Sequence, residues 1–266
     1  ERYSQIIARV NACEQHKTIH SISGSVWSDS HMILEEYLDG DEFDVDCLLS
    51  DGAMVFSSIT SEKPQPHMIE TGAFLPARYP QERQDELVAF VQQILISLGF
   101  RDGVFHVEMK YTSKGPRLIE VNARIGGGPI YRMVHRVWGV DLIEQYLLTC
   151  LGYKIAPQKA TEPLAYIASE IIVAPYSGIV LHDQFLQHLR QDPRIIYFQT
   201  YTVAGRHIHG PQNRVPEWLG EVIVHGKSPQ DADAILHDVV DSIELPLAKM
   251  QTIEYQAITL DTRNNS

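Results

Sequence analysis

Residues 103–112 and 115–124 carry acidic, amide and basic side chains of the kinds that bind metal ions and phosphate. Both runs alternate in polarity, as strands do, and the glycine and proline between them are typical of a turn. Folding the two runs about Lys114 places Glu108 opposite Glu120. Because side chains alternate between faces along a strand, one face is predicted to be polar and the other apolar. The polar face would carry His106, Glu108, Lys110, Glu120, Asn122 and Arg124, and the core face Phe105, Val107, Met109, Ile119 and Val121.

The two opposed carboxylates, Glu108 and Glu120, set the chemistry of this hairpin. At a separation of roughly 5 Å and an effective dielectric constant of roughly 20 they repel by about 3 kcal/mol. In a cleft, such a pair requires a cation or a shared proton. Glutamate and asparagine oxygens are hard ligands that suit Mg²⁺ or Mn²⁺. An ordinary amphipathic hairpin with a charged, solvated face explains the pattern equally well, so the pairing alone leaves both interpretations open.

Composition excludes several classes of protein. The 266 residues are 44% hydrophobic and 21% charged, which is typical of one large or two modest globular domains. The net charge of -12 argues against nucleic-acid and anionic-membrane partners. We find no signal-peptide pattern and no apolar run long enough to span a bilayer, and we expect a cytoplasmic protein with reduced, packed thiols at Cys47 and Cys150. A homo-oligomer is left open.

Hydrophobic periodicity predicts an α+β fold, because strand runs and helix runs segregate along the chain. Asp51 and Gly52 are typical of a hairpin turn, Gly99 of a helix end, and Asp141 and Ser228 of helix N-caps. We expect helices over 2–13, 87–98, 142–151, 183–189 and 229–241, strands over 32–38, 42–48, 53–56, 164–173, 194–203, 219–224 and 252–258, and a loop over 63–78. A polar, proline-marked stretch at 156–160 predicts two domains, 1–157 and 158–266.

Three motifs in order resemble the ATP-grasp superfamily over about residues 30–150. They are the run from Glu35 to Glu42, then His106-Val107-Glu108, then Glu120-Val121-Asn122-Ala123-Arg124. The resemblance implies the C-terminal subdomain of that fold, an antiparallel sheet with helices, followed by a small mixed α/β domain. No glycine-rich, lysine-bearing loop precedes residue 30, so the N-terminal part of the fold is expected to lie outside this sequence. The glycines at 126–128, with Glu70-Thr71-Gly72, resemble the amino-acid ligase branch, and within it enzymes that join β-alanine to L-histidine.

The resemblance also implies roles for individual residues. Adenine recognition would fall to Glu35, Glu36, Tyr37 and Leu38 on a hinge strand, with Glu42 on the ribose and His106 near the phosphates. Two Mg²⁺ or Mn²⁺ ions that bridge the ATP phosphates would be held by Glu108, Glu120 and Asn122. Arg124 would stabilise the charge on the transferred phosphoryl group. Glu70, Gly126 and Gly127 would contact the amino-acid substrate.

The implied reaction is an ATP-dependent ligation of two small-molecule amino acids through an acyl phosphate. Two other functions stay open at this point: a nucleotide-binding or scaffolding module without catalysis, and an ATP-grasp carboxylase that uses bicarbonate. For the other polar residues we favour a structural explanation over a catalytic one. The stripe Glu42, Asp44 and Asp46 is expected to be mostly a solvated strand face, with a role for Glu42 alone. His207 and His209 are expected in a polar loop, and Arg132 and His135 on a helix that could face the cleft.

Overall fold

A computed structural model describes residues 35–65, 69–212 and 215–249. The chain divides into two compact units, residues 1–38 and residues 39–266. In the described part of the first unit, residues 35–38, no strand is assigned. The predicted helix at 2–13 and the predicted strand at 252–258 lie outside the described residues.

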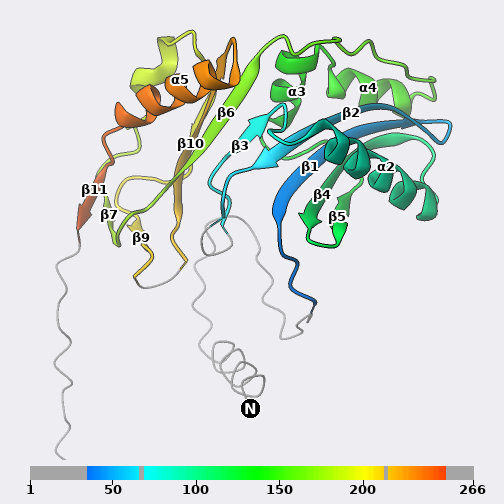
Figure 1. Cartoon of the computed structure of the whole chain (residues 1–266). Helices are drawn as coiled ribbons and strands as arrows, with labels where there is room; N and C mark the ends of the chain where they lie inside the picture. Colours follow the sequence, from blue (N-terminus) through cyan, green and yellow to red (C-terminus); the bar gives the residue numbers. More distant parts are fainter. Residues whose placement is uncertain (1–34, 66–68, 213–214, 250–266) are drawn as a thin grey trace, which may run out of the picture. The chain divides into compact units, whose positions relative to one another are not determined.

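The second unit consists of antiparallel β-sheets and helices (Figure 1). Within the described ranges, one eight-stranded sheet has the strand order β5-β4-β1-β2-β3-β6-β10-β8, and every neighbouring pair is antiparallel. This confirms the α+β prediction. The strands of this sheet are β1 (Asp41–Ser50), β2 (Ala53–Glu62), β3 (Ala73–Leu75), β4 (Gly103–Thr112), β5 (Gly115–Asn122), β6 (Tyr166–Val173), β8 (Ile195–Thr200) and β10 (Trp218–Gly226). A small second sheet joins β11 (Leu247–Lys249), β7 (Gly178–Val180) and β9 (His207–Ile208).

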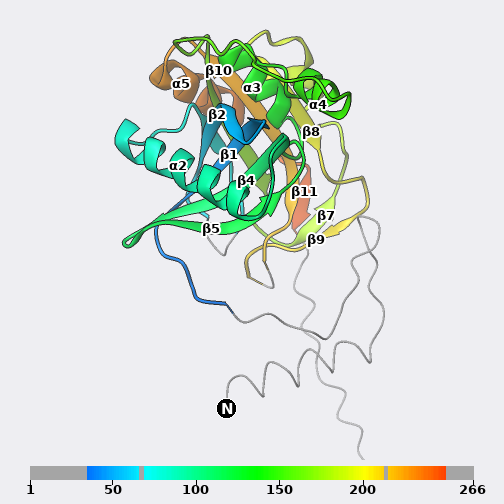
Figure 2. The same ribbon diagram turned by 90° about the vertical axis from the view of Figure 1, so that its right-hand side faces the viewer.

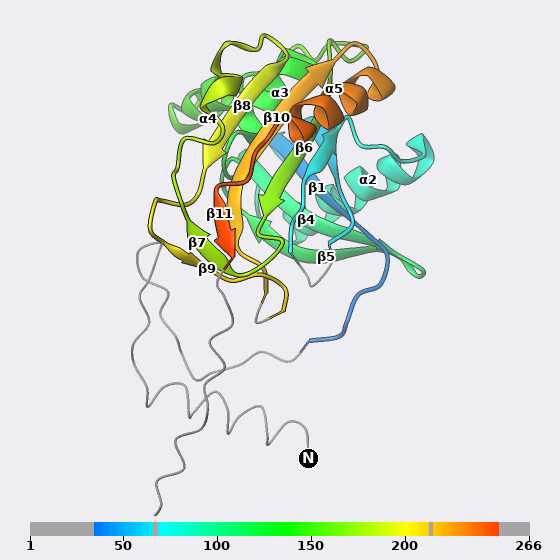
Figure 3. The same ribbon diagram turned by 90° about the vertical axis from the view of Figure 1, so that its left-hand side faces the viewer.

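Two helices cover the two halves of the large sheet. Helix α2 (Gln81–Ser97) packs on the half made of β1, β2, β4 and β5 (Figure 2). Its buried residues Leu87, Val91 and Leu95 meet the apolar faces of β1 and β4, and the helix ends before Gly99, whose φ of 89° is in the left-handed region, as predicted. Helix α5 (Pro229–Asp241) packs on β6 and β10 (Figure 3). The remaining helices are α3 (Ile130–Trp138), α4 (Leu142–Cys150) and the 3₁₀ helix η2 (Gln187–Gln191).

Turn and cap chemistry explains several boundaries. Asp51 and Gly52 both have positive φ (53° and 81°), which is the geometry of a two-residue hairpin turn between β1 and β2. Asp141 accepts hydrogen bonds from the backbone N–H groups of Ile143 and Glu144 and so begins α4. Ser228 accepts one from Asp231 and begins α5. These three predictions from local sequence are confirmed.

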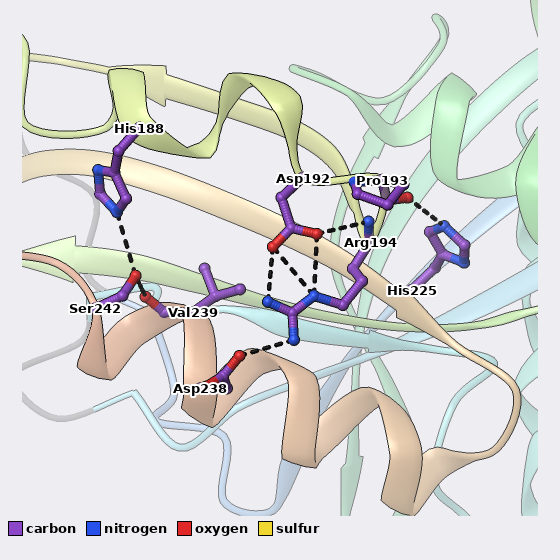
Figure 4. Close-up of polar contacts among 8 residues, drawn as sticks. All are labelled: His188, Asp192, Pro193, Arg194, His225, Asp238, Val239 and Ser242. Carbon is purple, nitrogen blue, oxygen red and sulfur yellow. Dashed lines mark hydrogen bonds and ion pairs between the residues drawn. The ribbon is translucent and has the colours of Figure 1, made fainter.

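A polar cluster joins the start of β8 to helix α5 (Figure 4). The guanidinium of Arg194 donates to both carboxylate oxygens of Asp192 and, at 2.7 Å, to Asp238 on α5. Beside it, His225 on β10 lies within hydrogen-bonding distance of the Pro193 carbonyl, at 3.2 Å. The cluster therefore links β8, β10 and α5 at one end of the sheet.

Several predictions made from the sequence are wrong. The segment 63–78 is not loop throughout, because Ala73–Leu75 forms β3 between β2 and β6. The helix expected at 183–189 is instead the 3₁₀ turn η2, and Cys150 is exposed at the end of α4, whereas Cys47 is buried as expected. Within the described ranges, no helix is both long enough and apolar enough to cross a membrane. The boundary at residue 157 stays a prediction.

Candidate active site

The β4–β5 hairpin has the predicted register at its chemical end. His106 pairs with Asn122, and Glu108 with Glu120. A β-bulge follows Glu108, so that Met109 pairs with Leu118. As a result, Leu118 packs against the core and Ile119 is 40% exposed, which corrects the prediction that Ile119 faces the core.

Strand β1 brings an acidic stripe next to this hairpin. In the β1–β4 pairing, Asp44 lies opposite Glu108 and Asp46 opposite His106. Asp46 is completely buried, and the Asp44 side chain is only 14% exposed. The prediction of a mostly solvated face is therefore wrong. The reason is that β1 is an interior strand between β2 and β4, a long-range arrangement that local sequence does not encode.

His106 and Asp46 form a buried polar pair. Nδ1 of His106 lies 3.0 Å from Oδ1 of Asp46. Burial lowers the pKa of His106, but the hydrogen bond to Asp46 and the charges of Asp46, Asp44 and Glu108 outweigh it and raise the pKa to about 9. The imidazolium is thus the local counter-ion of the stripe. Gly126 lies against the pair, because a Cβ there would be 2.9 Å from His106 Nδ1 and 3.1 Å from Asp46 Oδ1.

A second pair of acidic groups lies beside the first. Burial, above all, raises the pKa of Asp44 to about 7 and that of Glu62 on β2 to about 10, and the two carboxyls are hydrogen-bonded to each other. The charge of Asp44 and its hydrogen bond add to the effect of burial at Glu62, whereas the hydrogen bond to Glu62 opposes it at Asp44.

Glu108, Glu120, Asn122 and Arg124 form a chain of contacts at the edge of the sheet. The Asn122 amide donates to Glu120 at 2.7 Å, and Arg124 donates to Asn122 Oδ1 at 3.2 Å and to the Ile125 carbonyl at 3.0 Å. Burial first, and then the charges of Asp44 and Glu120, raise the pKa of Glu108 to about 7. The hydrogen bonds from Asn122 and Glu108 lower the pKa of Glu120.

This donor set fits a hard divalent cation in type. Two hydrogen-bonded carboxyls and an amide oxygen are ligands that Mg²⁺ and Mn²⁺ accept. The described residues contain no group of three or more His, Cys, Asp or Glu placed to hold a metal. The predicted set has only two such residues, Glu108 and Glu120, and relies on Asn122 for the third.

One cavity of about 320 Å³ is lined by six of the predicted site residues, whereas Glu120, Asn122 and Gly126 are not in its lining. Its lining includes Glu42, Glu70, His106, Glu108, Arg124 and Gly127 from the predicted site, and also Asp44, Glu62, Tyr201, Trp218 and Glu221, which sequence reasoning missed. Strand β4 is second and β10 seventh in the strand order, yet residues of both line this cavity. The strands between them form a curved sheet (Figure 1). Of the missed residues, Asp44 lies on β1 and was expected to be solvated, whereas the others lie on β2, on β10 and just after β8, where no motif marks them.

Other predicted site residues lie apart from this lining. Residues 35–38 belong to the first unit and have no strand, so the expected hinge strand is not present there. Lys110 forms an ion pair with Glu42, with 3.6 Å between Nζ of Lys110 and Oε2 of Glu42. Arg132 and His135 are exposed on α3 and are not part of the lining. His207 lies in the two-residue strand β9, with His209 just after it.

Comparison with protein families matches residues 1–131 to the ATP-grasp domain. The chain carries an ATP-grasp domain. Carnosine synthase 1 from Gallus gallus is 34% identical over 176 residues, which is 63% of this chain and 19% of that protein. The enzyme of the same name from Homo sapiens is 32% identical over 160 residues, 59% of this chain and 19% of the relative. An L-arginine-specific L-amino acid ligase from Bacillus subtilis is 28% identical over 147 residues, 52% of this chain and 35% of the relative.

Solved structures share the ATP-grasp fold. The L-amino acid ligase from Bacillus licheniformis superimposes with a TM-score of 0.69 at 21% identity, over 81% of this chain and 53% of that one. Phosphoribosylglycinamide synthetase from Anaerococcus prevotii gives a TM-score of 0.64 at 16% identity, over 80% of this chain and 55% of the other. The chain thus spans 19% of the length of the carnosine synthases and about half of these solved chains.

Proposed function

We propose that this protein is an ATP-dependent carboxylate–amine ligase that joins two amino acids, and that its reaction is the formation of carnosine from β-alanine and L-histidine. The observation that carries the proposal is the position of Arg124, Glu108 and His106 around one cavity of an ATP-grasp fold, with Glu120 and Asn122 beside Glu108. The carnosine synthases and amino acid ligases among its relatives support the substrate class.

The reaction has two steps. The carboxylate of the first amino acid attacks the γ-phosphorus of ATP, and the bond from that phosphorus to the bridging oxygen breaks. ADP departs, and the amino acid is left as an acyl phosphate. The amine of the second amino acid then attacks the acyl carbon, phosphate departs, and the amine nitrogen loses a proton as the amide forms.

Arg124 is assigned the catalytic role in this proposal. Its guanidinium, held by Asn122 and the Ile125 carbonyl, would stabilise the negative charge on the transferred phosphoryl group and on the acyl oxygen. Mg²⁺ or Mn²⁺, when bound, neutralises phosphate charge, and Glu108, Glu120 and Asn122 would hold it. Nucleotide contacts are assigned to Glu42 and His106, and substrate contacts to Glu70, Gly126 and Gly127.

The test is ADP formation by the purified full-length protein with amino-acid pairs that include β-alanine and L-histidine. Arg124→Ala and Glu120→Ala should each abolish ADP formation, because Arg124 would stabilise charge on the transferred phosphoryl group and Glu120 would hold the metal ion that neutralises phosphate charge. Arg117→Ala is the matched control, since Arg117 lies on the same hairpin and, within the described part of the chain, its side chain donates a hydrogen bond to the Pro116 carbonyl. Turnover retained by Arg124→Ala, or ADP release that depends on bicarbonate instead of an amino-acid pair, would contradict the proposal.

A further inference from the structure

The wall of the cavity opposite the hairpin carries an aromatic and acidic corner. Tyr201 follows β8, and its backbone N–H donates to the Leu219 carbonyl at 2.9 Å, which fixes the residue against β10. Its hydroxyl donates to Glu221 on β10 at 2.6 Å. The ring of Tyr201 lies 6.1 Å from that of Trp218, at an interplanar angle of 40°. All three side chains line the cavity.

Glu70 adds a second carboxylate to this corner. The segment that carries it is fixed to β6, because Ile171 N–H donates to the Thr71 carbonyl at 2.9 Å. Gly72 allows this close approach, since its φ is 134° and a Cβ there would lie 2.2 Å from the Ser169 carbonyl oxygen. Burial raises the pKa of Glu221, the Tyr201 hydrogen bond opposes that shift, and the charge of Glu70 adds to it.

Positive charge is missing on this wall. Among the described residues that line the cavity, the cationic side chains are Arg124 and His106, and both are engaged at the other wall, by Asn122 and Asp46. Lys63, which is near β6, is paired with Glu170 at 2.5 Å. The corner therefore presents two carboxylates and two aromatic rings to the cavity. Burial first, and then the charge of Glu42, raise the pKa of Glu70, and the charge of His106 opposes that rise.

We propose that Glu221, Tyr201 and Glu70 bind the ammonium group of the amino acid whose carboxylate is activated. The inference rests on the proposed ligase function, since it places that carboxylate at the hairpin wall beside Arg124. Carboxylates and aromatic faces both attract an ammonium ion. A cavity of about 320 Å³ has room for a small amino acid between the two walls.

The protonation state identifies which of the two substrates binds in this corner. Neighbouring carboxylates favour the charged form of an amine and raise its pKa. A protonated amine has no lone pair, so it cannot attack an acyl phosphate. The attacking amine therefore needs a different environment, whereas the amine of the activated amino acid must stay protonated to avoid reacting with a second acyl group. The corner suits the latter.

The test compares two ligands that differ only in the ammonium group, β-alanine and propionate. Glu221→Gln keeps an oxygen that can accept from Tyr201 but removes the charge. It should raise the KM for β-alanine roughly 10- to 100-fold, which is the range expected for loss of a hydrogen bond to a charged group. The inhibition constant of propionate as a competitor of β-alanine, and the KM for MgATP, should not change. A residue with only a structural role would shift all three constants together.

Glu170→Gln is the matched control, because Glu170 lies on the adjacent strand β6 and pairs with Lys63. It should leave the KM for β-alanine unchanged. If Glu221→Gln fails to fold in a thermal melt, Tyr201→Phe provides the second variant, with a smaller rise in the same KM. An unchanged KM for β-alanine in an active variant overturns this inference and leaves the ligase function standing. Wild-type protein that forms no ADP with any amino-acid pair overturns both.

Discussion

At the scale of single residues, the main feature of the site is a cluster of partly buried acidic side chains. Asp44, Glu62 and Glu108 have raised pKa values, mainly because they are removed from water, and His106 supplies a positive charge among them. Such a cluster is poorly neutralised without a ligand, which is the condition expected of a site that binds metal ions and amines. Two residues, His106 and Gly126, hold the cluster together, and each gives a prediction.

Replacement of His106 should destabilise the fold. His106→Ala removes the partner of Asp46, which is completely buried and whose Oδ2 already has no hydrogen-bond partner among the described residues. Loss of one member of a buried charged pair costs about 3–5 kcal/mol of unfolding free energy. Urea denaturation measures this, with His135→Ala, an exposed position on α3, as the near-neutral control. Equal midpoints for the two variants would show that the His106–Asp46 pair contributes little.

The two neighbouring glycines should respond differently to alanine. In Gly126→Ala the new methyl would lie 2.9 Å from His106 Nδ1 and from Ile130 Cγ2, and overpacking of this kind costs about 1–3 kcal/mol. At Gly127 a Cβ meets nothing within 4 Å, so Gly127→Ala should leave stability unchanged or slightly higher. Thermal melts of the two variants make the comparison. If the two variants lost the same stability, the glycines would be needed for their backbone flexibility and not for the lack of a side chain at Gly126.

At the scale of elements, the sequence predicted the features that depend on residues close together in the chain. The register that sets Glu108 opposite Glu120 follows from one short turn, and the caps at Asp141 and Ser228 follow from single side chains. The bulge at Glu108 and Met109 did not follow, because alternation alone carries no mark of an extra residue. The pairing of β1 with β4 joins segments about sixty residues apart, and it is this pairing that buries Asp46.

The cap of α5 offers a test at this scale. Ser228→Ala removes the acceptor for the Asp231 N–H and should cost about 1 kcal/mol of unfolding free energy, whereas Ser228→Gly should cost only a few tenths. Denaturant midpoints of the two variants give the difference directly. If both variants lose the same amount, Pro229 at the first helical position would be the dominant start signal instead of the Ser228 side chain.

At the scale of the whole molecule, the sheet and one core cluster cross the predicted boundary at residue 157. Strand β3 pairs with β6 through Phe74–Ala168 and Leu75–Ile167. The cluster combines Leu48 and Phe56 from one side with residues of the other. These latter residues are Ile167 and Ile223, with Ile196 and Tyr197 packed on them. Because the residues before and after position 157 share this buried cluster, the stability of one part depends on that of the other.

We therefore expect residues 39–249 to unfold in one cooperative transition. Buried contacts across the boundary are lost together, so the fluorescence of Trp138 before the boundary and of Trp218 after it, measured in a Trp27→Phe background, should give the same midpoint as far-UV circular dichroism. Ile167→Ala should lower that single midpoint. Two separate transitions, with only one of them sensitive to Ile167→Ala, would instead establish 158–266 as an independent domain.

The curvature of the sheet has a consequence for how such a site can diversify. The wall with Arg124 and Glu108 and the wall with Tyr201 and Glu221 come from separate stretches of the chain, and they meet only because the sheet bends around the cavity. Under the proposed assignment of Tyr201 and Glu221, substitutions in the second stretch would change which amine is admitted while the residues assigned to phosphoryl transfer stay as they are. Selection, or a directed library restricted to residues 199–221, would then change the amino-acid preference of the proposed ligase without altering the residues assigned to the step that consumes ATP.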